Sequence, residues 1–245
     1  MKTATLALAV LLLSTTTAFA AKIEKKTITT DKKERTYYLF VPDSITKQHP
    51  APLIVMLHGS GRTGNVLLEH WKSLAEKEGI ILAGPEATDI QQWAPPIDGP
   101  GLLRDIVEEL KAKYPIDERR VYLFGHSAGA RFALQLGLIQ SEYFAAVAVH
   151  AGDIDPRDDE IMKFAERKIP FALIVGTVDP FFPLAAVRGT RDMLKEGEFP
   201  VELTEIPYHN HDYYKISKSI NDIVWKFLKD KSLDAPQKYK VYANM

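Results

Sequence analysis

The chain has 245 residues, of which 46% are hydrophobic and 26% are charged, so its composition is that of a globular protein and excludes intrinsic disorder. Its formal net charge of −1 leaves no strong field for binding nucleic acid or an anionic membrane. It has no cysteine, which excludes thiol nucleophiles, disulfide bonds and zinc–thiolate sites.

Residues 1–20 have the pattern of a secretory signal peptide. Lys2 gives a positive start, residues 4–13 (ATLALAVLLL) form an apolar run, and Ala18-Phe19-Ala20 is a small-x-small cleavage site. The run is shorter than the ~20 residues that span a bilayer, although an uncleaved anchor helix is the alternative interpretation. We therefore expect residues 21–245 to be exported to the periplasm or the medium, without a membrane span.

From residue 22 onward, short strand patterns alternate with helical patterns. An alternating hairpin is predicted over 22–30 and 35–41, around a turn at Asp31-Lys32-Lys33. Apolar runs predict buried strands at 52–57, 80–83, 121–124, 144–149, 171–175 and 201–206, and amphipathic patterns predict helices at 66–77, 102–113, 128–137, 159–167, 185–195 and 216–228. This alternation predicts one domain of the α/β class, with a mostly parallel sheet and helices on both faces.

The chemical signal is the pentapeptide Gly125-His126-Ser127-Ala128-Gly129, between the strand VYLF and the helix that starts at residue 128. A serine on a very tight strand–helix turn projects its Oγ from the edge of the sheet, and the residues two before and two after it must be small. The N-terminus of the following helix favours developing negative charge. We predict that Ser127 is a nucleophile.

An upstream glycine-rich turn, His58-Gly59-Ser60-Gly61, follows the predicted strand at 52–57. Such a turn can direct backbone N–H groups at the oxygen of a tetrahedral intermediate. The predicted donors are the N–H groups of Ser60 and Ala128, the latter because it follows the nucleophile. An ordinary strand–helix turn is the alternative interpretation.

A nucleophilic serine needs a base and an acid, which should follow it in the order acid, then histidine. Asp179 follows the strand at 171–175 and is the predicted acid, with Asp153 as the alternative. Two histidines follow the strand at 201–206; His211 is favoured as the base over His209. The pair could instead bind a metal, but no third ligand at helical spacing is evident, so no metal or other cofactor is predicted.

Taken together, these motifs resemble those of the α/β-hydrolase superfamily, and especially its compact esterases of the polyhydroxybutyrate-depolymerase-like, feruloyl-esterase-like and esterase D-like groups. The motifs are HGSG at 58–61, GHSAG at 125–129, GTVD at 176–179 and YHNHDYY at 208–214. The similarity of His211-Asp212-Tyr213-Tyr214 to the sequence around the base of the esterase D group favours His211. The resemblance implies an α/β-hydrolase fold. The short segment 151–169 leaves no room for a large lid, and the absence of disulfides departs from secreted polymer-degrading members.

The resulting prediction is a secreted serine esterase acting on a small, neutral ester. Aromatic side chains on loops at the same sheet edge are candidates for a substrate pocket, namely Trp93, Phe181, Phe182, Tyr208 and Tyr213. Three alternatives stay open: a peptidase or acyltransferase with the same triad, a non-catalytic binding protein of the same fold, and a metal-dependent hydrolase using His209 and His211. The oligomeric state is not predicted.

Overall fold

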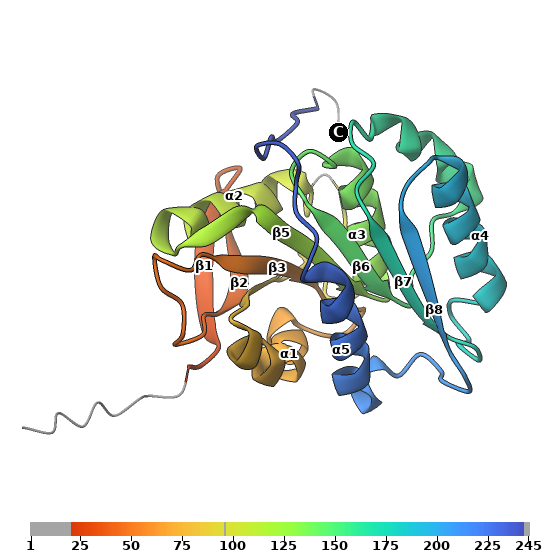
Figure 1. Cartoon of the computed structure of the whole chain (residues 1–245), viewed down its shortest axis with the longest axis horizontal. Helices are drawn as coiled ribbons and strands as arrows, with labels where there is room; N and C mark the ends of the chain where they lie inside the picture. The colour runs from red at the N-terminus through yellow and green to blue at the C-terminus, as the bar shows by residue number, and fades with distance from the viewer. Residues whose placement is uncertain (1–20, 96, 243–245) are drawn as a thin grey trace, which may run out of the picture.

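The computed structural model describes residues 21–95 and 97–242 (Figure 1). The predicted signal peptide lies outside the described residues. Within the described ranges, no helix has the length and apolar character needed to cross a membrane.

The centre of the molecule is an eight-stranded sheet in the order β1-β2-β4-β3-β5-β6-β7-β8. Its strands are β1 (Glu24–Thr30), β2 (Lys33–Phe40), β3 (Ala51–Leu57), β4 (Ile81–Pro85), β5 (Ile116–His126), β6 (Ala146–His150), β7 (Phe171–Gly176) and β8 (Val201–Ile206). The hairpin β1–β2 is antiparallel and β2 joins β4 antiparallel, while every pairing from β4 to β8 is parallel. The predicted fold class is confirmed.

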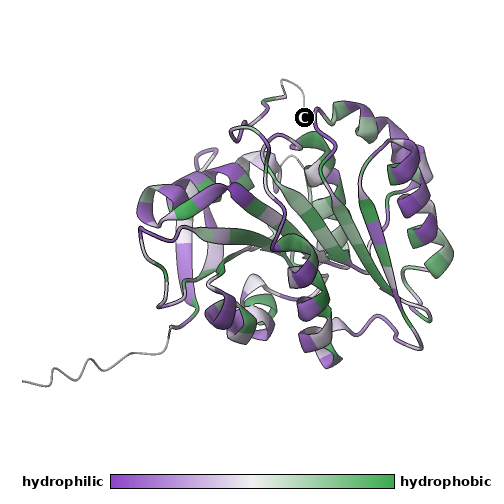
Figure 2. Ribbon diagram, in the orientation of Figure 1, coloured by the Kyte–Doolittle hydropathy of each residue, from purple (hydrophilic) through white to green (hydrophobic). Residues whose placement is uncertain are grey.

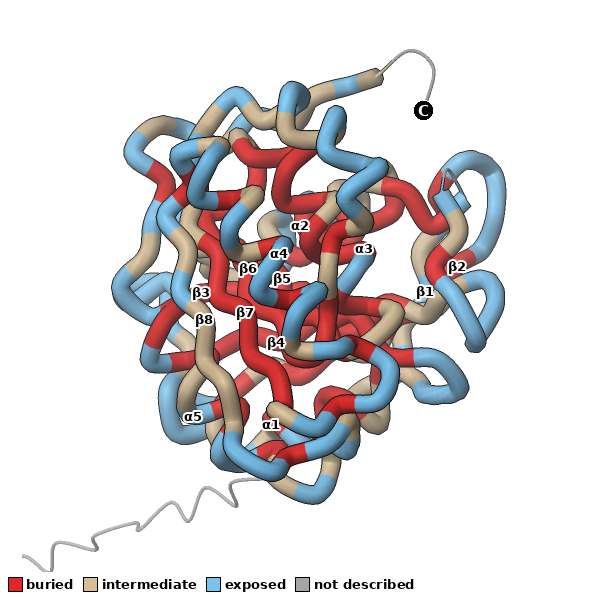
Figure 3. The backbone as a smooth tube through the Cα atoms, turned by 90° about the vertical axis from the view of Figure 1, so that its right-hand side faces the viewer, coloured by how far each residue is buried: buried red, intermediate tan, exposed pale blue. Residues whose placement is uncertain are grey.

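In the described ranges, five α-helices cover the two faces of this sheet (Figure 1). They are α1 (Gly64–Glu78), α2 (Pro100–Lys113), α3 (Ala128–Ile139), α4 (Leu184–Glu196) and α5 (Ser217–Leu228). Helices α1 and α5 pack on one face and bury one apolar cluster, whereas α2, α3 and α4 pack on the other face and bury a second cluster. The central strands are apolar in Figure 2 and buried in Figure 3, because both of their faces are covered.

Local sequence signals explain where helix α1 begins and ends. The Thr63 side chain accepts a hydrogen bond from the Val66 N–H at its start, and Gly79 adopts the left-handed conformation (φ 68°) at its end. Between these caps, Leu67, Trp71 and other apolar residues on one face are buried. The helix therefore runs slightly longer than the predicted 66–77.

The prediction of an α-helix over 159–167 is wrong. Residues Pro156–Phe164 form a 3₁₀ helix, η1, whose backbone is non-helical at Asp158 (φ −99°, ψ 17°). None of its residues is buried, so no apolar face stabilises a regular α-helix there. In the described part of the chain, η1 is the one helical element between β6 and β7, which agrees with the expected lack of a large lid.

The sequence of residues 233–245 has no clear pattern; the described part of this C-terminal segment, 233–242, runs beside the end of α3. The Gln140 side-chain amide bonds to this segment twice: its Nε2 donates to the Lys240 carbonyl (2.8 Å), and its Oε1 accepts from the Lys240 N–H (3.0 Å). The Tyr242 hydroxyl donates to the Ile139 carbonyl at 2.5 Å. The segment is thus a fixed part of the surface around α3.

Candidate active site

Ser127 occupies a strained turn between β5 and α3. Its backbone has φ 58° and ψ −119°, a conformation that residues with a side chain rarely adopt. A Cβ on Gly125 would lie 2.3 Å from the carbonyl oxygen of Gly129, and a Cβ on Gly129 would lie 2.1 Å from the carbonyl oxygen of Leu57. Glycine is therefore required on both sides of Ser127, as the predicted tight turn demands.

The structure brings together the three side chains predicted to form a catalytic set. The His211 Nε2 atom lies 2.9 Å from the Ser127 Oγ, and its Nδ1 atom lies 2.9 Å from Oδ2 of Asp179. With Nδ1–H donating to the carboxylate, Nε2 is free to accept the hydroxyl proton of Ser127. The two hydrogen bonds form a continuous relay from hydroxyl to carboxylate.

Backbone amides fix the orientation of the Asp179 carboxylate. Its Oδ1 atom accepts hydrogen bonds from the N–H groups of Phe181 and Phe182, both at 2.9 Å, and the side chain is fully buried. The alternative acid, Asp153, instead pairs with Arg131 at 2.7 Å. The parallel neighbours β7 and β8 bring the Asp179 and His211 loops together, since the Val178 N–H donates to the His209 carbonyl.

Ser60 and Ala128, the predicted oxyanion donors, both lie beside Ser127. Both residues line the same cavity as Ser127 and His211, which we call the Ser127 cavity. Within the described residues, neither N–H donates a hydrogen bond to another protein group. The loop is held over the turn at Gly59, where a Cβ would be 3.2 Å from the Ser127 Cβ. Two unsatisfied donors at this position are suited to an anionic oxygen.

The Ser127 cavity has a volume of about 710 Å³ and a mixed aromatic and polar wall. Trp93, Phe181 and Phe182, all predicted from the sequence, line it, and Phe182 stacks on the His211 ring at 5.6 Å. The prediction that Tyr208 and Tyr213 line the substrate pocket is wrong. Tyr208 points to solvent with 90% of its surface exposed, and Tyr213 is fully buried in the core.

Sequence reasoning missed three residues of α3 that line this cavity. Arg131, Phe132 and Gln135 follow Ser127 at helical spacing and face the cavity. The signal was available, because a helix that starts at the nucleophile turns the same face inward at every third or fourth residue.

Behind the Ser127 turn lies a row of three buried histidines. The Nδ1 atoms of His126 and His150 are 3.0 Å apart, and the Nε2 atoms of His150 and His209 are 3.2 Å apart. His126 and His150 meet because they are paired residues at the ends of the neighbouring parallel strands β5 and β6. A neutral imidazole has one N–H group that donates and one nitrogen that accepts. Neutral histidines can therefore form both contacts of this row, with a single proton between the two nitrogens of each contact.

His209 is thus a member of this buried row, whereas His211 contacts Ser127 and Asp179. Among the described residues, no group of three histidine, cysteine, aspartate or glutamate side chains could hold a metal ion.

Burial keeps the row uncharged. It lowers the pKa of His126 to about 3, with the nearby His211 acting in the same direction, and it lowers the pKa of His150 well below its usual value. Burial also lowers the pKa of His209.

We expect acid to destabilise the fold through this row. In the unfolded chain a histidine binds a proton below about pH 6.5, whereas folded His126 and His150 stay neutral there. The unfolded state therefore binds more protons, and the free energy of unfolding falls as the pH falls. The loss at about pH 5.5 is roughly 1–2 kcal/mol for each of the two histidines, measurable by urea unfolding at about pH 7.5 and about pH 5.5.

A His150→Gln variant tests the origin of this loss, since glutamine keeps polar atoms but does not titrate. Its stability should depend less on pH than that of the wild type. The matched control is His49→Gln, at an exposed position, which should leave the pH dependence unchanged. An equal pH dependence in wild type and His150→Gln would show that the row is not the cause.

Comparisons with known proteins agree with this geometry. A family model described as phospholipase/carboxylesterase matches residues 101–229. The chain is 29% identical over 174 residues to a bifunctional acetylxylan esterase/xylanase of Neocallimastix patriciarum, covering 67% of this chain and 25% of that protein. It is also 29% identical over 140 residues to a poly(3-hydroxybutyrate) depolymerase of Ralstonia pickettii, covering 48% of this chain and 29% of that protein.

A solved structure of a thermostable esterase superposes with a TM-score of 0.71 at 23% identity, covering 86% of this chain and 63% of that one. This likeness concerns the fold. The chain spans 25% to 41% of the length of the curated relatives it matches, so their activities as whole proteins do not transfer directly.

Proposed function

Because the chain belongs to the phospholipase/carboxylesterase family of the α/β-hydrolase superfamily, we propose that it is a serine esterase that cleaves carboxylic esters through an acyl-enzyme. The observation that carries the proposal is the relay in which His211 bridges Ser127 and Asp179 at 2.9 Å on each side. A serine hydroxyl is a weak nucleophile unless a base accepts its proton, and this relay supplies one.

In the first half-reaction the Ser127 Oγ attacks the ester carbonyl carbon while its proton passes to His211 Nε2. The oxygen of the tetrahedral intermediate accepts from the N–H groups of Ser60 and Ala128, each worth ~3–4 kcal/mol in the transition state. Asp179 stabilises the imidazolium and holds its orientation. The C–O bond to the alcohol then breaks, and the alcohol leaves with the proton from His211.

In the second half-reaction water attacks the acyl-enzyme carbonyl and gives a proton to His211. Collapse of the second intermediate releases the carboxylic acid and returns the proton to the Ser127 Oγ. Water can approach the base directly, because His211 keeps 21% of its side chain exposed.

We also propose that residues 1–20 are a signal peptide and that residues 21–245 act as one exported domain. The support is the sequence pattern of a positive start, an apolar run and Ala18-Phe19-Ala20. Mass determination of the N-terminus after secretion would test the cleavage site.

The activity is tested by incubating the chain with p-nitrophenyl acetate and, separately, with a fluorophosphonate probe. We expect hydrolysis with an initial burst of about one nitrophenolate per chain, and covalent labelling of Ser127 found by peptide mapping. Absence of labelling would favour a non-catalytic binding protein. Labelling together with release of amines from peptides, but no ester turnover, would favour a peptidase.

A further inference from the structure

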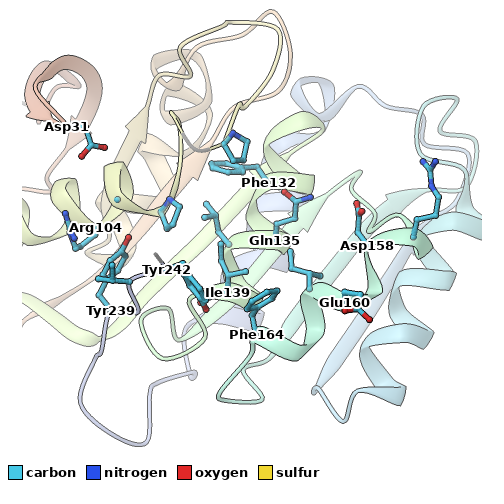
Figure 4. A pocket seen from close by; sticks show the side chains of 17 residues that line it. Asp31, Arg104, Phe132, Gln135, Ile139, Asp158, Glu160, Phe164, Tyr239 and Tyr242 are labelled. Carbon is cyan, nitrogen blue, oxygen red and sulfur yellow. The ribbon is translucent and has the colours of Figure 1, made fainter. Parts of the chain in front are cut away.

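A second cavity of about 610 Å³ lies beyond the Ser127 cavity along α3. We call it the remote pocket; among the residues around it in Figure 4 are Phe132, Gln135, Ile139, Phe164, Tyr239 and Tyr242. They come from α3, η1 and the C-terminal segment, three parts of the chain that are far apart in sequence.

The two cavities are neighbours along one face of α3. Phe132 and Gln135 line both of them, and Ile139 continues the same face into the remote pocket. At 1.5 Å per helical residue, Gln135 lies about 12 Å and Ile139 about 18 Å along the helix from Ser127. A molecule bound covalently at Ser127 would therefore reach the remote pocket with an arm of about 12 Å or more.

The wall of the remote pocket is suited to an uncharged group. Phe164 and Tyr242 meet edge to face at 5.6 Å, and Ile139 adds an aliphatic surface. The rim residue Arg104 is already bound by its neighbour Asp105 at 2.6 Å, and Arg157 is bound by Asp155 at 2.6 Å.

Three carboxylate side chains also lie around the remote pocket. Asp31, Asp158 and Glu160 are among the lining residues, and Figure 4 shows Asp31 at one side of the remote pocket and Asp158 and Glu160 at the other. The two guanidinium groups are neutralised locally and Glu160 is paired with Lys163, so Asp31 and Asp158 leave the surroundings of the pocket unfavourable to an anion. The tyrosine rings already carry cations of this chain, because Arg104 lies 4.7 Å over the Tyr239 ring and Lys240 lies 5.3 Å over the Tyr242 ring.

We propose that the remote pocket binds the far end of the substrate, and that the substrate class is a neutral ester with an apolar or aromatic arm of about 12 Å or more. This inference rests on the proposed esterase activity and specifies its substrate. It differs from the small ester expected from the sequence, because the sequence does not reveal that α3, η1 and the C-terminal segment enclose a second cavity.

The test compares two ester series on the full chain: p-nitrophenyl esters from acetate to dodecanoate, and acetate esters of alcohols from ethanol to dodecanol. We expect kcat/KM to increase with chain length in one of the two series. In that series Phe164→Glu should lower kcat/KM for the longest ester about tenfold, since an apolar contact is replaced by a charge. Its kcat/KM for p-nitrophenyl acetate should not change, because that substrate ends inside the Ser127 cavity.

Phe164→Leu is the matched control, because it keeps an apolar side chain at the same half-exposed position; it should retain most of the activity on the longest ester. Equal effects of Phe164→Glu on short and long esters, or no effect on either, would overturn the assignment. No preference for long esters in either series would do the same. Hydrolysis of p-nitrophenyl acetate tests the esterase activity separately, so failure of the remote pocket and failure of the proposed function are distinguishable.

Discussion

Replacing Ser127 by alanine is expected to lower kcat/KM for p-nitrophenyl acetate by about 10⁴- to 10⁶-fold and to abolish fluorophosphonate labelling. The reason is that Oγ is the atom bonded to His211 Nε2, and no other hydroxyl takes that place in the relay. Alanine keeps the Cβ of serine, so the strained backbone at φ 58° is unchanged. The melting temperature should stay close to that of the wild type.

The matched control is Ser219→Ala, which removes a hydroxyl from an exposed position on α5. It should leave both turnover and labelling intact. Turnover by Ser127→Ala at a tenth of the wild-type rate or more would exclude Ser127 as the nucleophile and would reopen the metal-dependent alternative.

Replacing His211 by alanine is expected to cause a loss of similar size, because Ser127 would then have no base and Asp179 no partner to orient. The free energy of unfolding should fall by about 1–3 kcal/mol, since the buried Asp179 carboxylate loses its partner at Oδ2. The measurement is kcat/KM over a range of pH, combined with urea unfolding.

Replacing His209 by alanine should give the opposite result. It leaves the His150 Nε2 atom without its partner, at a cost of about 1–3 kcal/mol in the free energy of unfolding, but it does not touch the relay. Activity at a temperature where the variant is folded should stay within about tenfold of the wild type. If His209→Ala is inactive and His211→Ala is active, the assignment of the base is reversed.

The sequence predicts the strands well where both of their faces are buried. The runs at 52–57 and 171–175 are apolar at every position, and they become β3 and β7 within one residue of the predicted ends. Prediction fails at 159–167, where an amphipathic pattern predicts an α-helix but the structure has the 3₁₀ helix η1, none of whose residues is buried. Periodicity alone cannot tell whether a face will find a partner to pack against.

The candidate site is predictable where chain order and strand ends constrain it. Ser127, Asp179 and His211 all follow parallel strands, which end at the same edge of the sheet, so their convergence follows from the topology. Tyr208 also follows a strand, but its backbone has φ 57°, and the side chain points to solvent. The direction of a side chain in a turn depends on a local backbone conformation that residue type alone does not specify.

The backbone at Ser127 has a consequence for how this protein can be stabilised. A residue with a Cβ at φ 58° and ψ −119° costs about 1–3 kcal/mol, against a total stability of about 5–15 kcal/mol for an ordinary domain. Glycine would relieve that cost but would remove the hydroxyl. A selection for heat resistance alone would therefore favour inactive chains at this position, whereas a selection for activity would hold the fold below its attainable stability.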